Sequence, residues 1–500
     1  MDAHMFGWLS VIPPALAIGL AVGSRQAVPA LLAGIWVGWV IAAGGHPFDG
    51  TTATIQGLID VFSDPSQTRV VVFTLLMGAF LLLLQRGGGV AGFLLWAGRW
   101  RWSGTRRGAQ LLASCLGLGV FIESTITCLV VGAVARPIFD RLRIAREKLA
   151  YICDATSAPV CMLIPINSWG ALILGLLTTQ ASLGTLGDRG PVAIFLAAIP
   201  LNFYAVLSVL LVFVVAATGW DVGPMRRAER RATEEGKLVA DGARPVVTDS
   251  VLLEGTGNEA PPRARNLVVP LTLMIGTVLV GIAVTGAIGV RAAGVEAPTL
   301  VDYLNNASGS TAVLCGVLAG LAGLAVLLTA SGIVTGTELV DVAFRGAGAM
   351  LPIATLLVLA FGIGAVCDAL GTGPFIAARA TPYLTPLLVA PVVFLVSGGM
   401  AFATGTSWGT FAIMIPLALP LAATMNLEGE PVSLPLVVSA VLGGGVFGDH
   451  CSPISDTTLI ASMAAWSDHI DHVRTQLPYA LAAAAGTVLL YLGAGFLGVG

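Results

Sequence analysis

Residues 448–458 read Gly-Asp-His-Cys-Ser-Pro-Ile-Ser-Asp-Thr-Thr, and this polar stretch lies between two apolar segments, 437–446 and 459–465. A polar island that contains a proline and is flanked by hydrophobic arms predicts a helix that breaks inside a membrane. Each of its two carboxylates, Asp449 and Asp456, costs roughly 2.5–3.5 kcal/mol at bilayer depth. We therefore expect a compensating cation, either Na⁺, H⁺ or a basic group of a substrate. A polar loop at the membrane surface is the alternative, but it gives no reason for so many oxygen ligands in one short stretch.

The composition indicates that the whole chain belongs in a membrane. Of its 500 residues, 56% are hydrophobic and 11% are charged, whereas soluble domains carry about 25% charged residues. Apolar runs long enough to span a bilayer recur along the chain, and we expect an all-α polytopic membrane protein with about 11–13 membrane segments. The seven cysteines form no CxxC pair, which favours buried thiols over a disulfide or metal set. The sequence has no phosphate-binding loop, so ATP-driven transport by this chain is not expected.

One long polar segment, 221–266, divides the apolar chain and carries eight Arg and Lys residues. The positive-inside rule predicts that this segment is a cytoplasmic linker in a multi-pass protein of the cell inner (plasma) membrane. It separates a first transmembrane half, 1–220, from a second, 267–500. We interpret its charge as that of a solvated connector and not as a site for nucleic acid.

Each half contains a hairpin with a polar break, followed by an aspartate-led break. The hairpins are 108–139 and 384–424, and the broken helices are expected near 154–159 and 448–458. Basic clusters flank the first hairpin on both sides, whereas no Lys or Arg lies between residues 380 and 474. The ends of the two hairpins should therefore lie on opposite faces of the membrane. This pattern predicts two inverted-topology repeats with re-entrant hairpins and broken helices that meet near the midplane. A chance likeness between glycine-rich membrane segments is the alternative.

The acidic residues at these breaks are the candidate charge carriers. A hard cation such as Na⁺ prefers carboxylate, hydroxyl and carbonyl oxygens, and we expect Na⁺ at Asp154, Asp449 and Asp456. Nearby hydroxyls could complete the site, although each of them can instead bond its own helix backbone. The predicted ion- or substrate-binding residues are Glu123, Ser124, Thr125, Asp154, Thr156, Ser157, Asn167, Thr404, Thr406, Ser407, Asp449, Ser452, Ser455, Asp456 and Thr457.

Three further polar or aromatic features are open to two interpretations each. Trp169, after the candidate ligand Asn167, is expected to pack or to anchor at the interface. His450 could tune the proton affinity of its neighbour Asp449, or it could be a satisfied hydrogen-bonding histidine. Residues 468–472 contain two Asp and two His residues; we expect a wet loop there, with metal binding as the alternative.

The motifs GDHCSPISDTT at 448–458, REKLAYI at 146–152 and DATSAPV at 154–160 resemble those of the NhaC-type sodium/proton antiporter family. The resemblance covers most of the chain and implies a multi-spanning inner-membrane transporter that exchanges Na⁺ for H⁺. At broader range the family resembles ion-coupled carriers of organic anions and amino acids. One departure bears on the cargo. Members that handle sodium alone often have Phe-Ile-Asp-Asp at the first break, whereas residues 121–124 read Phe-Ile-Glu-Ser, which leaves less negative charge for a bare cation.

Two functions fit these features. The first is Na⁺/H⁺ antiport by alternating access, with buried carboxylates that bind Na⁺ or H⁺ competitively. The second is a Na⁺- or H⁺-coupled carrier of a small amino acid or organic carboxylate. We expect no enzyme activity and no cofactor besides Na⁺ and H⁺ as transported or coupling ions. The expected partners are a small ion or small-molecule substrate and the lipid bilayer, and a homodimer is left open.

Overall fold

The structure is a computed structural model that describes residues 6–24, 27–89, 92, 104–121, 124–245, 260–295, 298–372, 375, 379, 384–427, 429, 431–453 and 455–498. Across these ranges the regular structure is helical, apart from an isolated β-bridge between Pro245 and Asp468. Eight helices in the described part are long and apolar enough to cross a membrane, and shorter apolar helices accompany them. The prediction of an all-α polytopic membrane protein is therefore confirmed.

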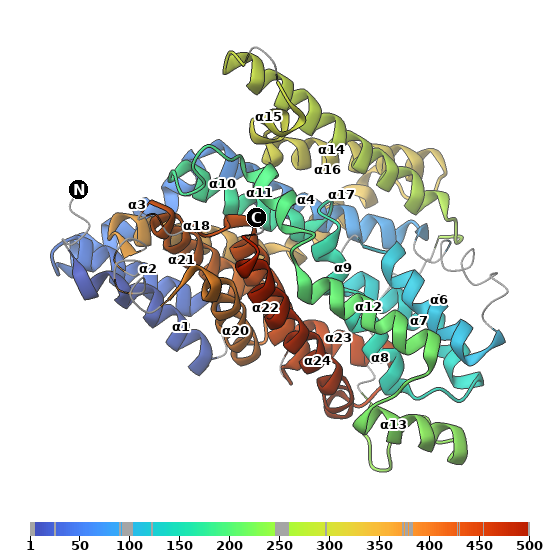
Figure 1. Cartoon of the computed structure of the whole chain (residues 1–500). Coiled ribbons are helices and arrows are strands. Elements are labelled where there is room, and N and C mark those ends of the chain that lie inside the picture. Colours follow the sequence, from blue (N-terminus) through green and yellow to red (C-terminus); the bar gives the residue numbers. More distant parts are fainter. Residues whose placement is uncertain are drawn as a thin grey trace.

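The helices before residue 236 run from blue to green in Figure 1, and those after residue 264 run from yellow-green to red. In chain order the first group is η1 (Gly7–Val11), α1 (Ile12–Ser24), α2 (Ala27–Ala42), α3 (Pro47–Ser63), α4 (Pro65–Arg86), α6 (Arg106–Gly119), α7 (Ser124–Arg141), α8 (Arg146–Ala155), α9 (Ala158–Leu163), α10 (Ser168–Ser182), α11 (Pro191–Ala198), α12 (Phe203–Thr218), α13 (Gly223–Arg230) and η3 (Arg231–Glu235). The second group is α14 (Arg265–Ala292), α15 (Leu300–Asn305), α16 (Gly309–Ala330), α17 (Gly336–Ala349), α18 (Leu351–Ala369), α20 (Pro386–Thr404), α21 (Ser407–Leu427), α22 (Leu434–Cys451), α23 (Asp456–Ala465) and α24 (His469–Phe496). Helices α14 and α16 pack on each other, and α16 and α17 pack on α4, along one edge of the molecule (Figure 1).

In the described part of the chain, two interrupted helices carry the predicted aspartates Asp154 and Asp449, and a proline lies at each interruption. Helix α8 ends at Ala155, and Pro159 lies in the first turn of the short α9 that follows. Helix α22 is followed by Pro453, and α23 then begins with Ser455 as its N-cap, whose hydroxyl accepts a hydrogen bond from the Thr458 N–H at 3.1 Å. Proline lacks an N–H group and disfavours helical geometry in the residue before it. The local sequence therefore sets where each helix stops and restarts.

Each interrupted helix packs against a helical hairpin. Helices α6 and α7 form the first hairpin, and α7 packs against α8 and α23. Helices α20 and α21 form the second hairpin, and both pack against α22. The second hairpin turns at Gly405, which has φ +70° and whose N–H bonds the Ala401 carbonyl. Glycine adopts this left-handed conformation without the steric cost of a Cβ atom, so the turn between α20 and α21 can be tight.

The two interrupted helices lie across each other. Helix α23, the second piece of one, packs against α8, the first piece of the other, and α22 packs against α9 in the same way. The first segment of each broken helix therefore packs against the second segment of the other, as expected when two broken helices run antiparallel. This is the arrangement in which inverted repeats bring their breaks together. Both breaks consequently contribute side chains to one place in the protein.

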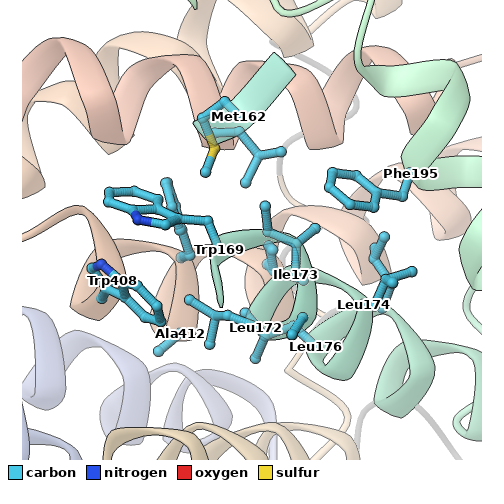
Figure 2. Packing of buried hydrophobic residues seen from close by; sticks show 14 of the residues in the cluster. Met162, Trp169, Leu172, Ile173, Leu174, Leu176, Phe195, Trp408 and Ala412 are labelled. Atoms are coloured by element: carbon cyan, nitrogen blue, oxygen red, sulfur yellow. The ribbon is translucent and has the colours of Figure 1, made fainter. Parts of the chain in front are cut away.

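A large apolar cluster packs beside this crossing and joins the N-terminal and C-terminal helices. Trp169 in α10 is fully buried, and its ring centroid lies 5.1 Å from that of Trp408 in α21. Figure 2 shows the two indoles side by side below Met162 of α9, with Ile173 of α10 next to them and Phe195 of α11 on the far side of Ile173. Trp169 is therefore a packing residue, which is one of its two predicted roles.

Candidate functional site

Asp449 lies in the last turn of α22, immediately before the break, and its side chain is fully buried. Ser407, the first residue of α21, donates its hydroxyl to Asp449 Oδ2 at 2.7 Å, and Thr457 Oγ1 lies 3.3 Å from the same oxygen. Ser407 Oγ also lies 3.2 Å from the Gly445 carbonyl oxygen. Helices α21, α22 and α23 thus gather oxygen atoms around one carboxylate. This is the type of ligand set that a hard cation prefers.

Asp154 lies at the end of α8, before the other break, and is also fully buried. Its Oδ2 accepts hydrogen bonds from the Thr458 hydroxyl at 2.9 Å and from the Gln476 amide at 2.7 Å. Its Oδ1 has no hydrogen-bond partner among the described residues and lies 4.0 Å from His450 Nε2. His472 Nε2 lies 3.9 Å from Oδ2. The neighbours of this carboxylate are an amide N–H, a hydroxyl and two imidazoles, and nitrogen groups of this kind are not the oxygen ligands that a hard cation prefers.

Thr458 connects the two carboxylate residues. Its Oγ1 lies 2.9 Å from Asp154 Oδ2 and 3.2 Å from the backbone carbonyl oxygen of Asp449. A hydroxyl carries one proton, so Thr458 can donate to one of these two acceptors at a time. The state of Asp154 is therefore linked by one side chain to the backbone at Asp449.

His450 is held by the helix on its other side. The Tyr204 hydroxyl of α12 lies 3.0 Å from His450 Nδ1, and both side chains are buried. The ring therefore points its Nε2 towards Asp154 and not towards its sequence neighbour Asp449. His450 therefore has the hydrogen bond expected of it, between Tyr204 and Nδ1. The carboxylate that its Nε2 faces is Asp154, not its neighbour Asp449.

Most of the other predicted hydroxyl residues bond backbone atoms near the breaks. Ser124 is buried at the start of α7, and Thr406 is half-buried before α21. The hydroxyl bonds join Thr156 to the Ile152 carbonyl (2.6 Å), Ser157 to the Asp154 carbonyl (2.8 Å), Thr404 to the Met400 carbonyl (2.9 Å) and Ser452 to the Phe402 carbonyl (2.8 Å), while Ser455 caps α23. The sequence alternative, in which such hydroxyls bond their own helix backbone, therefore describes four of these five, whereas Ser452 bonds a carbonyl of α20.

Asn167 shapes the connection between α9 and α10. Its Oδ1 accepts from the Gly170 N–H at 2.9 Å and caps α10, and its amide nitrogen lies 2.9 Å from the Cys161 carbonyl and 2.6 Å from the Ile164 carbonyl. These bonds engage both ends of the amide. Three predicted positions cannot be placed in this geometry: Glu123 lies outside the described residues, as do the side chains of Thr125 and Asp456.

Gln476 was not predicted as a site residue, and His472 was expected in a wet loop. The expectation of a wet loop is wrong for His472, which is fully buried in the first turns of α24. No group of His, Cys, Asp and Glu that could hold a metal ion was found in the described part of the chain. His472 and Gln476 are spaced i, i+4 and therefore lie on one helix face. Two polar residues with that spacing, directly before the apolar run 477–496, were the sequence feature that could have indicated a buried polar site.

A helical membrane protein whose interrupted helices cross at buried carboxylates is a secondary transporter. The chain belongs to the Na⁺/H⁺ antiporter family, because the model of that family matches residues 160–496. The resemblance seen in the sequence motifs is thereby confirmed.

Three similar proteins add detail. The chain is 35% identical to an uncharacterized protein of Haemophilus influenzae over 97% of this chain and 91% of the relative. It is also 35% identical to the malate-2H⁺/Na⁺-lactate antiporter of Bacillus subtilis, over 23% of this chain and 24% of that protein. Among solved structures, the Alcanivorax borkumensis YdaH transporter, described as having an unusual topology, matches 90% of both chains with a TM-score of 0.57 at 15% identity. This last similarity supports the fold alone.

Proposed function

We propose that this chain exchanges Na⁺ for H⁺ across the cell inner membrane by alternating access. The observation that carries the proposal is a pair of fully buried carboxylates, Asp154 and Asp449, whose residues share the hydroxyl of Thr458 where the broken helices cross. Carboxylates buried at bilayer depth need a positive partner. Na⁺ and H⁺, the two ions in the description of the family, can both fill that role.

Na⁺ binds at Asp449. Its ligands are the Asp449 carboxylate, the hydroxyls of Ser407 and Thr457, and backbone carbonyls at the break between α22 and α23. A hydroxyl that donates to the carboxylate has lone pairs that can turn towards a cation. Asp456, predicted from the sequence as a ligand, remains a proposed ligand at this break.

The proton binds at Asp154, which narrows the sequence-based assignment of Na⁺ to all three aspartates. When Asp154 is ionised, Thr458 donates its hydroxyl proton to Asp154 Oδ2. When Asp154 is protonated, its own O–H donates to Thr458 Oγ1, and Thr458 then donates to the Asp449 carbonyl. The Asp449 carbonyl oxygen then accepts the Thr458 hydroxyl and is less available as a ligand for Na⁺. A proton at one carboxylate therefore disfavours Na⁺ at the other, which is the competition that exchange requires.

The crossing is exposed to each side of the membrane in turn by rocking of the two repeats. We propose the division expected from the sequence: halves 1–220 and 267–500, joined by a cytoplasmic linker at 221–266. The hairpins α6–α7 and α20–α21 move with the repeats to which they belong.

Purified full-length protein in liposomes tests the proposal. A Na⁺ gradient should drive proton flux without any added solute, measured with a pH-sensitive dye inside the vesicles. Asp154→Asn and Asp449→Asn should each abolish this flux. Asp60→Asn, an exposed position in α3, is the matched control and should behave as wild type. Full proton flux in both buried variants would refute the proposal.

A second candidate is an ion-coupled carrier of a small organic carboxylate. It is favoured by the single acidic residue at 121–124 and by the similarity, over about a quarter of each chain, to the malate-2H⁺/Na⁺-lactate antiporter. The same vesicles separate the two candidates. Proton flux that appears only after malate, lactate or an amino acid is added would favour the carrier.

A further inference from the structure

A chain of polar side chains leads away from Asp154 along α23 and α24. Ser462 Oγ lies 2.8 Å from His472 Nδ1 and 3.1 Å from His469 Nδ1. Ser462 and His472 are fully buried, whereas His469 is half-buried. The Nδ1 atoms of both imidazoles therefore face the single hydroxyl of Ser462. The Na⁺ site at Asp449 uses none of these three groups.

The far nitrogen of each imidazole must carry a hydrogen. His469 Nε2 lies 2.8 Å from the Pro453 carbonyl oxygen, which can only accept. His472 Nε2 lies 2.9 Å from Gln476 Oε1. The orientation of that amide is fixed, because its nitrogen lies 3.0 Å from the His450 carbonyl, another pure acceptor, and 2.7 Å from Asp154 Oδ2. Gln476 Oε1 is therefore the acceptor, and both histidines are Nε2–H tautomers.

The two imidazoles and Ser462 then lack one hydrogen-bond donor. With both imidazoles neutral, each Nδ1 needs a donor, and the Ser462 hydroxyl supplies one proton for two acceptors. The Thr458 carbonyl, 2.8 Å away, competes for the same proton. One additional proton completes the arrangement, because one Nδ1–H then donates to Ser462 Oγ while the Ser462 hydroxyl donates to the other Nδ1. Buried polar groups that lack a partner are unfavourable, so the extra proton supplies the missing hydrogen bond, and the Asp154 carboxylate 3.9 Å from His472 Nε2 offsets the cost of burying its charge.

The two ends of this unit reach different places. At the inner end, His472 Nε2 lies 3.9 Å from Asp154 Oδ2. At the outer end, His469 contacts the exposed Pro453, beside Asp468, whose carboxylate accepts from the backbone N–H of Arg244 at 2.9 Å. The outer end therefore opens on the face that carries the linker.

The titratable groups around the unit come from several elements. Asp154 of α8 faces His472, and His450 of α22 lies beyond Asp154, with Tyr204 of α12 bonded to its other nitrogen. Within α24 itself, Asp471 lies between the two histidines and is partly exposed. Among these, the carboxylate of Asp154 is the group at the inner end that can accept a proton from His472.

We propose that His469, Ser462 and His472 hold one shared proton and carry it between the linker-side surface and Asp154. This rests on the proposed exchange of a proton at Asp154. In delivery, the His469 Nδ1–H moves to Ser462 and the Ser462 hydroxyl proton moves to His472 Nδ1. His472 Nε2 first shifts from Gln476 Oε1 towards Asp154 Oδ2, 3.9 Å away, and its N–H bond then breaks as an O–H bond forms on Asp154, which leaves both rings neutral. Delivery leaves the hydrogen of His472 on Nδ1 and that of His469 on Nε2. Rotation of the His472 ring about its Cβ–Cγ bond returns its hydrogen to the side of Asp154, and the same rotation of the His469 ring turns its bare Nδ1 to the surface, where it takes a proton from hydronium and releases water.

Two measurements on Ser462→Ala test the proposal, with His46→Gln, an exposed histidine before α3, as control. The first is side-chain NMR of the full chain with histidine labelled with heavy nitrogen. In wild type, His469 and His472 should share a single proton-binding step, identified by assignment with His469→Gln and His472→Gln. In Ser462→Ala the two rings should titrate separately. Independent titration already in wild type would overturn the proposal, whatever the transport activity.

The second measurement compares two fluxes in liposomes. Ser462→Ala should slow Na⁺-driven proton flux by about 100-fold, at the lower end of what positioned proton-transfer groups contribute. Exchange of radioactive Na⁺ for unlabelled Na⁺, which moves no proton, should stay within twofold of wild type. Equal loss of both fluxes would mean a structural role and would overturn the relay. Absence of Na⁺-driven proton flux in wild type would instead refute the proposed function, and the NMR result would still decide whether the pair shares a proton.

Discussion

Replacing Ser407 with alanine removes one oxygen from the proposed Na⁺ site and leaves the carboxylate in place. The Ser407 hydroxyl lies 2.7 Å from Asp449 Oδ2 and comes from the first residue of α21. A hydrogen bond to a charged group contributes about 1.5–3 kcal/mol, and the loss of a Na⁺ ligand of similar strength corresponds to about 10- to 150-fold in a binding constant. We therefore expect the Na⁺ concentration for half-maximal exchange to rise by that factor, with little change in the rate at saturating Na⁺.

The assay is the initial rate of proton flux in proteoliposomes over a series of Na⁺ concentrations. Thr410→Val is the matched control, because Thr410 is buried one turn further along α21 and its hydroxyl bonds the Thr406 carbonyl at 3.0 Å. An unchanged Na⁺ dependence in Ser407→Ala would refute the assignment of Ser407 as a ligand. An equal loss in Thr410→Val would show that the effect reflects packing of α21 and not the cation site.

Three further substitutions test other parts of the account. Thr458→Val keeps the side-chain shape but removes the hydroxyl shared by Asp154 and Asp449. The Na⁺ affinity, measured at several pH values, should therefore lose most of its pH dependence. A pH dependence equal to that of wild type would contradict the coupling between Asp154 and Asp449. Trp169→Ala empties part of the fully buried core and should reduce the free energy of unfolding by about 3–5 kcal/mol, seen as a lower Tm. Lys148→Ala removes the ion-pair partner of Asp221, and loss of one partner of a buried pair lowers the free energy of unfolding by about 3–5 kcal/mol. The double variant Lys148→Met, Asp221→Leu should recover part of that stability, measured as Tm in the same thermal unfolding experiment. A double variant no more stable than Lys148→Ala would argue against the pair.

The broken helices could be predicted because their causes are local. Pro159 and Pro453 interrupt apolar helices, and the polar residues beside them include both buried aspartates. The likeness between the two breaks and the asymmetry of basic residues then indicated an inverted repeat. The breaks depend on residues that are close in the sequence, so hydrophobic pattern and proline chemistry were sufficient to predict them.

The partners within the site could not be predicted in the same way. Gln476 reaches Asp154 from more than 300 positions away, and Tyr204 reaches His450 from a different helix. Such pairings depend on how helices cross, which side-chain pattern does not specify. Lys148 is a second example: it belongs to the basic cluster that follows the first hairpin, and it is fully buried against Asp221 of the polar linker.

Hydroxyl residues were the least predictable class. Ser407 and Thr457 point to Asp449, whereas Thr156 and Ser157 bond the backbone of their own break. All four have the same donor and acceptor chemistry. The helix that lies opposite each side chain decides between the two outcomes, and that choice is made by tertiary packing.

Proton release on Na⁺ binding tests the central claim most directly. Na⁺ is added to weakly buffered, purified protein, and the released protons are measured with a pH indicator. The account predicts that wild type releases protons in proportion to the Na⁺ bound, that Asp449→Asn binds no Na⁺ and releases none, and that Asp154→Asn binds Na⁺ without releasing protons. Na⁺ binding to wild type without proton release, or undiminished release from Asp154→Asn, would contradict it.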